Sequence, residues 1–174
     1  MLYKKSETWK NYGLLKVEKP WRLLWQVPMC LVITILVGAL ANELFSNFLG
    51  VQVMPQNRFA ALSGNLPLFL IWLVIGWVVG GFFEEMIFRG FLLGHIESLF
   101  GKYRWSAAVG VVGQAFLFGL VHFYNRGIVG GLTIFIVGIT MGILFLGLRR
   151  NLWPLIIAHG IIDTLSFIED FLAT

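Results

Sequence analysis

The chain has 174 residues, of which 58% are hydrophobic and 13% are charged, and its mean hydropathy is +0.82. Soluble domains carry about 25% charged residues, so this composition excludes an ordinary water-soluble domain and indicates an integral membrane protein. The formal net charge of +4 says less than the places where the cations lie. The single cysteine, Cys30, lies in an apolar stretch, which excludes a disulfide within this chain and a zinc site built from several thiolates.

Five apolar segments are predicted to cross the membrane as helices, so we expect an all-α, polytopic transmembrane bundle. They cover residues 23–41, 66–96, 105–123, 128–148 and 152–172. The first approaches spanning length and is interpreted as a retained helix, not as a signal peptide, although Ala39-Leu40-Ala41 resembles a cleavage site. The second would extend about 46 Å as a helix, beyond the ~30 Å hydrocarbon core. We therefore expect it to be tilted, to protrude, or to be broken near Gly80-Gly81.

The cations gather on one side of this arrangement. With the N-terminus in the cytoplasm, the external connections hold two cations, Arg58 and Arg126, and ten lie in the N-terminal tail and the other connections. The ten are Lys4, Lys5, Lys10, Lys16, Lys19, Arg22, Lys102, Arg104, Arg149 and Arg150. This asymmetry follows the positive-inside rule. It predicts a basic cytoplasmic tail over residues 1–22, a single transmembrane domain over residues 23–174 in a lipid bilayer, and no nucleic-acid partner.

Ionisable side chains interrupt the apolar segments at three places. Such groups cost roughly 3 kcal/mol each within a membrane and normally face protein or water. The three places are Glu84-Glu85-x-x-x-Arg89, Phe118-x-x-x-His122 and His159-x-x-x-Asp163. Residues four apart share one face of a helix, so each motif is expected to present its polar groups together.

The two adjacent glutamates are predicted to play different parts. Arg89 lies one turn after Glu85 and is expected to pair with it, whereas Glu84 has no cation at that spacing. Glu84 then suits a general base that takes a proton from water. The two histidines suit the orientation of that water or the stabilisation of an oxyanion.

The residues alone leave several alternatives open. A zinc ion held by His122, His159 and a glutamate such as Glu84 has suitable ligand types, so the site holds either a divalent metal or none. The same cluster suits a proton- or ion-coupled transporter, or a non-catalytic immunity or scaffold protein. Helix lengths place His122 near the outer surface and His159 near mid-membrane, so one common site requires the third helix to lie deeper or lean inward, or the expected segment limits to be off by a turn.

The order of the three motifs in a polytopic membrane chain resembles the CPBP family over about residues 75–167. This is the bacterial CAAX-protease and bacteriocin-processing group, related to the type II CAAX prenyl endopeptidases. The resemblance implies an all-helical intramembrane endopeptidase of the cell membrane that cleaves a membrane-associated peptide or protein. It implies that Glu84 and His122 activate water, with Glu85 and Arg89 completing the site. The family is described both as metalloproteases and as metal-free, glutamate-dependent enzymes.

Two departures qualify what the resemblance implies. The third motif assigns His159 and Asp163 to the oxyanion or to polar support, yet the prenyl-protease branch has asparagine at the position of Asp163. A carboxylate cannot donate a hydrogen bond unless it is protonated. Many relatives carry additional helices, so a partner subunit would have a place in the substrate groove. Bacteriocin or signal-peptide maturation, or self-immunity, is the role we expect.

Overall fold

The fold was taken from a computed structural model that describes residues 8–17, 19–51 and 57–173. Helices and turns account for the described residues, without a strand, which confirms the all-α class. The α-helices are α1 (Leu23–Leu49), α2 (Leu66–Ile75), α3 (Leu93–Leu99), α4 (Ser106–Gly147) and α5 (Trp153–Leu172). Shorter or wider helices are η1 (Trp9–Tyr12), η2 (Pro20–Arg22), η3 (Asn57–Leu62), η4 (Gly76–Glu84) and η5 (Met86–Leu92). Lys4 and Lys5 of the expected tail, and the end of the expected domain at Thr174, lie outside the described residues.

Three helical stretches are long and apolar enough to cross a membrane: Pro20–Leu49, Leu66–Leu99 and Ser106–Gly147. They support an integral membrane protein. The last of them is bent, and the expected fifth segment corresponds to α5, which has 20 residues. The count of five crossings stays a prediction.

The bend divides α4 into two halves at Gly127, whose φ of 64° and ψ of −171° are not helical. Glycine has no Cβ and adopts such angles without strain. The break falls between the two segments expected there. The halves pack against each other where a Cβ on Gly138 would meet Ala115 at 3.0 Å, and Gln114 Nε2 donates a hydrogen bond to the Gly138 carbonyl at 2.8 Å. The Gly138–Gly142 spacing thus serves close helix packing, as small residues do within membranes.

The second apolar segment continues as one helix from α2 to α3 and is not broken at Gly80-Gly81. Its middle, η4 and η5, is wound with i→i+5 hydrogen bonds, which the spacing of apolar residues did not predict. The glycines instead bring η4 close to α5. A Cβ on Gly81 would meet the Ile156 carbonyl at 3.0 Å, and a Cβ on Gly160 would meet the Trp77 ring at 2.6 Å.

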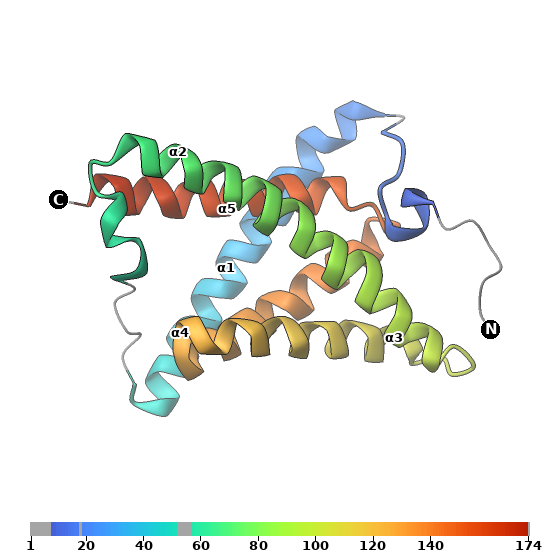
Figure 1. Ribbon diagram of the computed structural model, residues 1–174. Coiled ribbons are helices and arrows are strands. Elements are labelled where there is room, and N and C mark those ends of the chain that lie inside the picture. Colours follow the sequence, from blue (N-terminus) through green and yellow to red (C-terminus); the bar gives the residue numbers. More distant parts are fainter. Residues whose placement is uncertain (1–7, 18, 52–56, 174) are drawn as a thin grey trace, which may run out of the picture.

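The two ends of the bundle differ in what they carry. In Figure 1, η1 and the turns that join α3 to α4 and α4 to α5 lie on the right, while the bend of α4 and the C-terminus lie on the left. The right-hand end is tied together, because Leu152 N donates to the Gly13 carbonyl at 2.9 Å and Trp153 Nε1 donates to the Leu15 carbonyl at 2.9 Å. Its turns hold four of the ten cations assigned to the cytoplasm, Lys102, Arg104, Arg149 and Arg150. The orientation in the membrane stays a prediction.

Candidate active site

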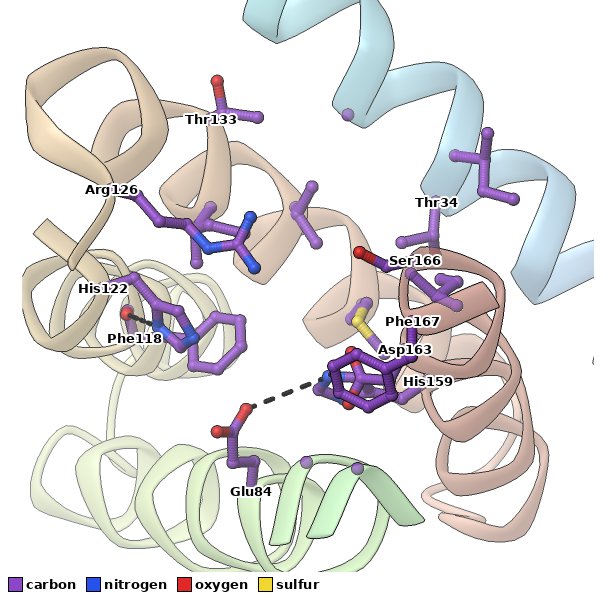
Figure 2. A pocket seen from close by; sticks show the side chains of 18 of the residues that line it. Thr34, Glu84, Phe118, His122, Arg126, Thr133, His159, Asp163, Ser166 and Phe167 are labelled. Atoms are coloured by element: carbon purple, nitrogen blue, oxygen red, sulfur yellow. Dashed lines mark hydrogen bonds and ion pairs between the residues drawn. The ribbon is translucent and has the colours of Figure 1, made fainter. Parts of the chain in front are cut away.

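A cavity of about 370 Å³ lies between α1, η4, α4 and α5. It is lined by four of the six candidate residues, Glu84, His122, His159 and Asp163. Figure 2 shows the Glu84 carboxylate directed into the space between the two histidines, which come from α4 and α5. Three motifs that are far apart in the sequence therefore meet at one cavity.

Glu85 and Arg89 lie behind the cavity wall, where neither side chain is exposed. Arg89 Nη1 donates to Glu85 Oε1 at 2.9 Å, which is the expected pair. Burying either charge alone would cost several kcal/mol, so the two groups require each other. The Arg89 guanidinium also lies 4.4 Å from the centre of the Phe118 ring, a cation–π contact that ties η5 to α4.

His159 is held by Glu85 more closely than by its own helix neighbour. Its Nδ1 donates to Glu85 Oε1 at 2.8 Å. The expected contact with Asp163 is longer, 3.9 Å from Nε2 to Oδ1, and Nε2 lies equally far, 3.9 Å, from Glu84 Oε2. Glu85 therefore orients the ring so that Nε2 faces the two carboxylates at the cavity.

The orientation of His122 follows from the residue four positions before it. Its Nδ1 lies 2.8 Å from the Phe118 carbonyl oxygen, and the ring meets the Phe118 ring edge-on at a centroid distance of 4.6 Å. A carbonyl only accepts, so Nδ1 carries the hydrogen and, in the neutral ring, Nε2 keeps its lone pair. The Phe118-x-x-x-His122 spacing thus leaves Nε2 available as an acceptor.

The first half of α4 is longer than the segment expected there. It continues past Phe123 to the bend at Gly127, so His122 lies within the helix and not at its end. The boundary expected at Phe123 was about one turn too early. Glu84, His122 and His159 line the same cavity, and their depths in the bilayer stay a prediction.

Several cavity residues were missed by the sequence analysis, among them Thr34, Arg126 and Ser166. Arg126 was assigned only to an external connection, yet it is the last residue before the bend and its side chain lines the cavity. One signal could have found it, because Arg126 lies four residues after His122 and shares its helix face. Thr34 comes from α1, outside the three motifs, and carries no comparable signal.

A metal site was tested against the same geometry. Across residues 8–17, 19–51 and 57–173, no three His, Cys, Asp or Glu side chains are grouped so that they could hold a metal ion. Glu84, His122 and His159 line one cavity but do not form a ready ligand set. Their assignment as zinc ligands stays a prediction.

In a comparison with known protein families, the chain matches the family described as type II CAAX prenyl endopeptidase Rce1-like. The match covers residues 66–165, more than half of the chain. The chain belongs to this family. Membership in the Rce1-like family makes it a CAAX-type intramembrane protease, and all six candidate residues lie within the matched region. No curated protein and no solved structure matches the chain.

Proposed function

We propose that this Rce1-like protein hydrolyses a peptide bond of a membrane-associated peptide or protein by means of water that Glu84 and His122 activate. One observation carries the proposal: Glu84, His122, His159 and Asp163 line one cavity, and the remaining charged pair of the motifs is sealed behind its wall. Glu84 is the glutamate that water can reach, since 26% of its side chain is exposed and none of Glu85 is.

The water would lie between the Glu84 carboxylate and His122 Nε2. Glu84 accepts one proton as the water oxygen attacks the carbonyl carbon, while His122 Nε2 accepts a hydrogen bond from the other O–H. The Phe118 carbonyl fixes the ring for this task, because it holds the hydrogen on Nδ1. General base catalysis of this kind contributes about 10²- to 10⁴-fold in rate.

The bond changes then balance within the site. Attack forms the new C–O bond and a tetrahedral oxyanion, and collapse breaks the C–N bond. Glu84 returns its proton to the leaving nitrogen, which gives a free amine and a carboxylic acid. His159 faces the cavity through Nε2; in the imidazolium form, with Nδ1–H donated to Glu85, its Nε2–H donates a hydrogen bond to the oxyanion and keeps its proton. Asp163 lies one turn from this ring and is not required as a donor.

The biological setting is proposed at a coarser level. We place the protein in the cell membrane, with processing of bacteriocin-like or signal peptides, or self-immunity, as its role. The family's description names CAAX prenyl endopeptidases, so a prenylated C-terminal peptide is a second substrate to test. A partner subunit that completes the substrate groove belongs to the same proposal.

Mass spectrometry of peptide products is the direct test. The purified protein, in detergent or reconstituted in lipid, is incubated with a farnesylated peptide ending in the CAAX pattern and with hydrophobic leader peptides. The wild-type chain should release defined fragments, whereas a folded Glu84→Gln variant should not. Metal analysis of the same samples addresses the zinc assignment. Cleavage that survives Glu84→Gln would contradict the proposed base, and solute or proton flux without any fragments would favour a transporter.

A further inference from the structure

Arg126 has a position that the hydrolytic proposal does not use. It ends the first half of α4, and its exposed side chain reaches the cavity that holds Glu84 and His122. The bend at Gly127 and the absence of a side chain on Gly130 allow this, because a Cβ on Gly130 would collide with the stem of Arg126. The backbone at the bend therefore keeps Arg126 at the cavity.

The charges at the cavity are unevenly distributed. Arg126 is the only lysine or arginine among the described residues that line it, whereas Glu84 and Asp163 contribute carboxylates. The other cation of the motifs, Arg89, is buried behind the wall and faces Glu85. A bound anionic group would consequently be drawn toward Arg126 and away from Glu84 and Asp163.

The spacing along α4 sets where such an anion would lie on a bound peptide. Arg126 follows His122 by one turn, which separates their Cβ atoms by about 5–6 Å. An extended peptide advances about 3.3–3.6 Å per residue. If the peptide bond to be cleaved lies at His122, the part of the peptide that reaches Arg126 is therefore about two residues further along.

The chemistry of the Arg126 side chain and of the nearby cavity wall indicates which class of ligand would bind. A guanidinium presents its donors in a planar fork that matches a carboxylate. Phe59, Trp72 and Phe167 line the same cavity and pack together, with ring centroids 4.9 Å apart for Phe59 and Trp72 and 5.4 Å apart for Phe59 and Phe167. An apolar peptide segment that carries one carboxylate fits this lining.

We infer that Arg126 binds a carboxylate of the substrate peptide, located about two residues from the cleaved bond. This rests on the proposed function and defines its substrate class: apolar peptides with a carboxylate at that distance, supplied either by the free C-terminus or by an Asp or Glu side chain. Arg126 is then a specificity-determining residue and takes no part in the proton transfers.

Binding to a protein that cannot cleave tests the inference. Fluorescein-labelled, farnesylated peptides with a free C-terminus, with an amidated C-terminus, and with an amidated C-terminus plus one Asp side chain are titrated by fluorescence anisotropy. The proteins are Glu84→Gln alone and Glu84→Gln combined with Arg126→Gln, Arg126→Lys or Arg104→Gln. Arg104 is exposed in the turn before α4 and serves as the matched control.

Arg126→Gln should raise the Kd of a carboxylate-bearing peptide about tenfold or more, which is the loss expected for a charge-assisted hydrogen bond. It should leave the Kd of the fully amidated peptide unchanged, Arg126→Lys should have an intermediate effect, and Arg104→Gln none. Which carboxylate responds, the C-terminal one or that of Asp, identifies the source. Equal weakening of all three peptides, or no weakening of any, would overturn the inference.

Two further outcomes separate the inference from the proposed function. Wild-type cleavage that is unchanged by Arg126→Gln, with equal rates for acid and amide, would overturn the inference and leave the proposed function standing. Carboxylate-selective binding that needs Arg126, without any cleavage by the wild type, would support the inference and contradict the proposed function. An effect of Arg126 that appears only with phosphatidylglycerol would assign the side chain to a lipid phosphate and overturn the inference.

Discussion

Two turns of this protein share the Phe-x-x-x-His pattern, Phe91 to His95 and Phe118 to His122, and the second lines the cavity whereas the first does not. The hydrogen bond is nearly the same in both, although the two rings are tilted by 32° in the first turn and meet edge-on at 65° in the second. In each turn the histidine Nδ1 lies close to the phenylalanine carbonyl oxygen, at 2.9 Å for His95 and 2.8 Å for His122. The i, i+4 spacing on a helix is therefore enough to fix the imidazole.

The surroundings of the two turns differ. Phe91 is 43% exposed, and His95 is also exposed. Phe118 is only 2% exposed and contacts the Arg89 guanidinium, while His122 lines the cavity together with Glu84. Spacing thus sets the hydrogen bond of the ring, and tertiary packing decides whether the ring lines a cavity with a carboxylate.

Replacing each of the two histidines in turn tests whether only the one at the cavity takes part in cleavage. His122→Ala should lower the cleavage rate by about 10²- to 10⁴-fold, because the water loses one of its two orienting groups. His95→Ala should leave the rate unchanged. Rates are measured on the peptide that the wild type cleaves, with thermal unfolding in detergent to show that both variants fold. Similar losses in the two variants would mean that the cavity does not distinguish them.

The spacing of four residues correctly placed Glu85 against Arg89, and the gap between the third and fourth apolar segments, residues 124–127, contains the bend found at Gly127. The hydrogen bond between His159 and Glu85 was not predictable, because its partners are 74 residues apart. The periodicity of a sequence indicates which residues share one face of a helix, but not which other helix packs against that face. Arg126 differs in this respect, because its spacing of four residues after His122 could have placed it on the face that lines the cavity.

The buried pair next to Phe118 offers a second contrast, now within one motif. Glu85→Gln should destabilise the protein by about 3–5 kcal/mol, because it leaves Arg89 buried without its counter-charge. Glu84→Gln should change stability far less, since Glu84 faces the cavity. Denaturant-induced unfolding in detergent measures both free energies. Equal effects would show that the two glutamates share one environment.

The two phenylalanines, Phe118 and Phe91, are expected to contribute differently to the stability of the fold. Phe118→Leu should destabilise the fold by about 2 kcal/mol, because the desolvated cation–π contact with Arg89 is lost. Phe91→Leu changes an exposed ring, and its effect should stay within about 0.5 kcal/mol. The same unfolding measurement compares them. A larger loss for Phe91 would contradict the assignment of Phe118 to the wall that supports the site.

The smallest effect is expected at Asp163. Its 3.9 Å separation from His159 Nε2 exceeds hydrogen-bond length, so the carboxylate contributes little to orienting the ring. Asp163→Asn should therefore change the cleavage rate by less than about tenfold, the range for a weak polar contact. Steady-state rates on the same peptide check this. A loss comparable to that of His122→Ala would give Asp163 a direct part in the reaction.

Glu84 and His122 are proposed to act on the same water, and a double-mutant cycle of cleavage rates tests whether they do. If they form one unit, Glu84→Gln combined with His122→Ala should be hardly slower than the more impaired single variant, because the first substitution already removes what the second would remove. Losses that multiply in the double variant would show two independent contributions and contradict the account.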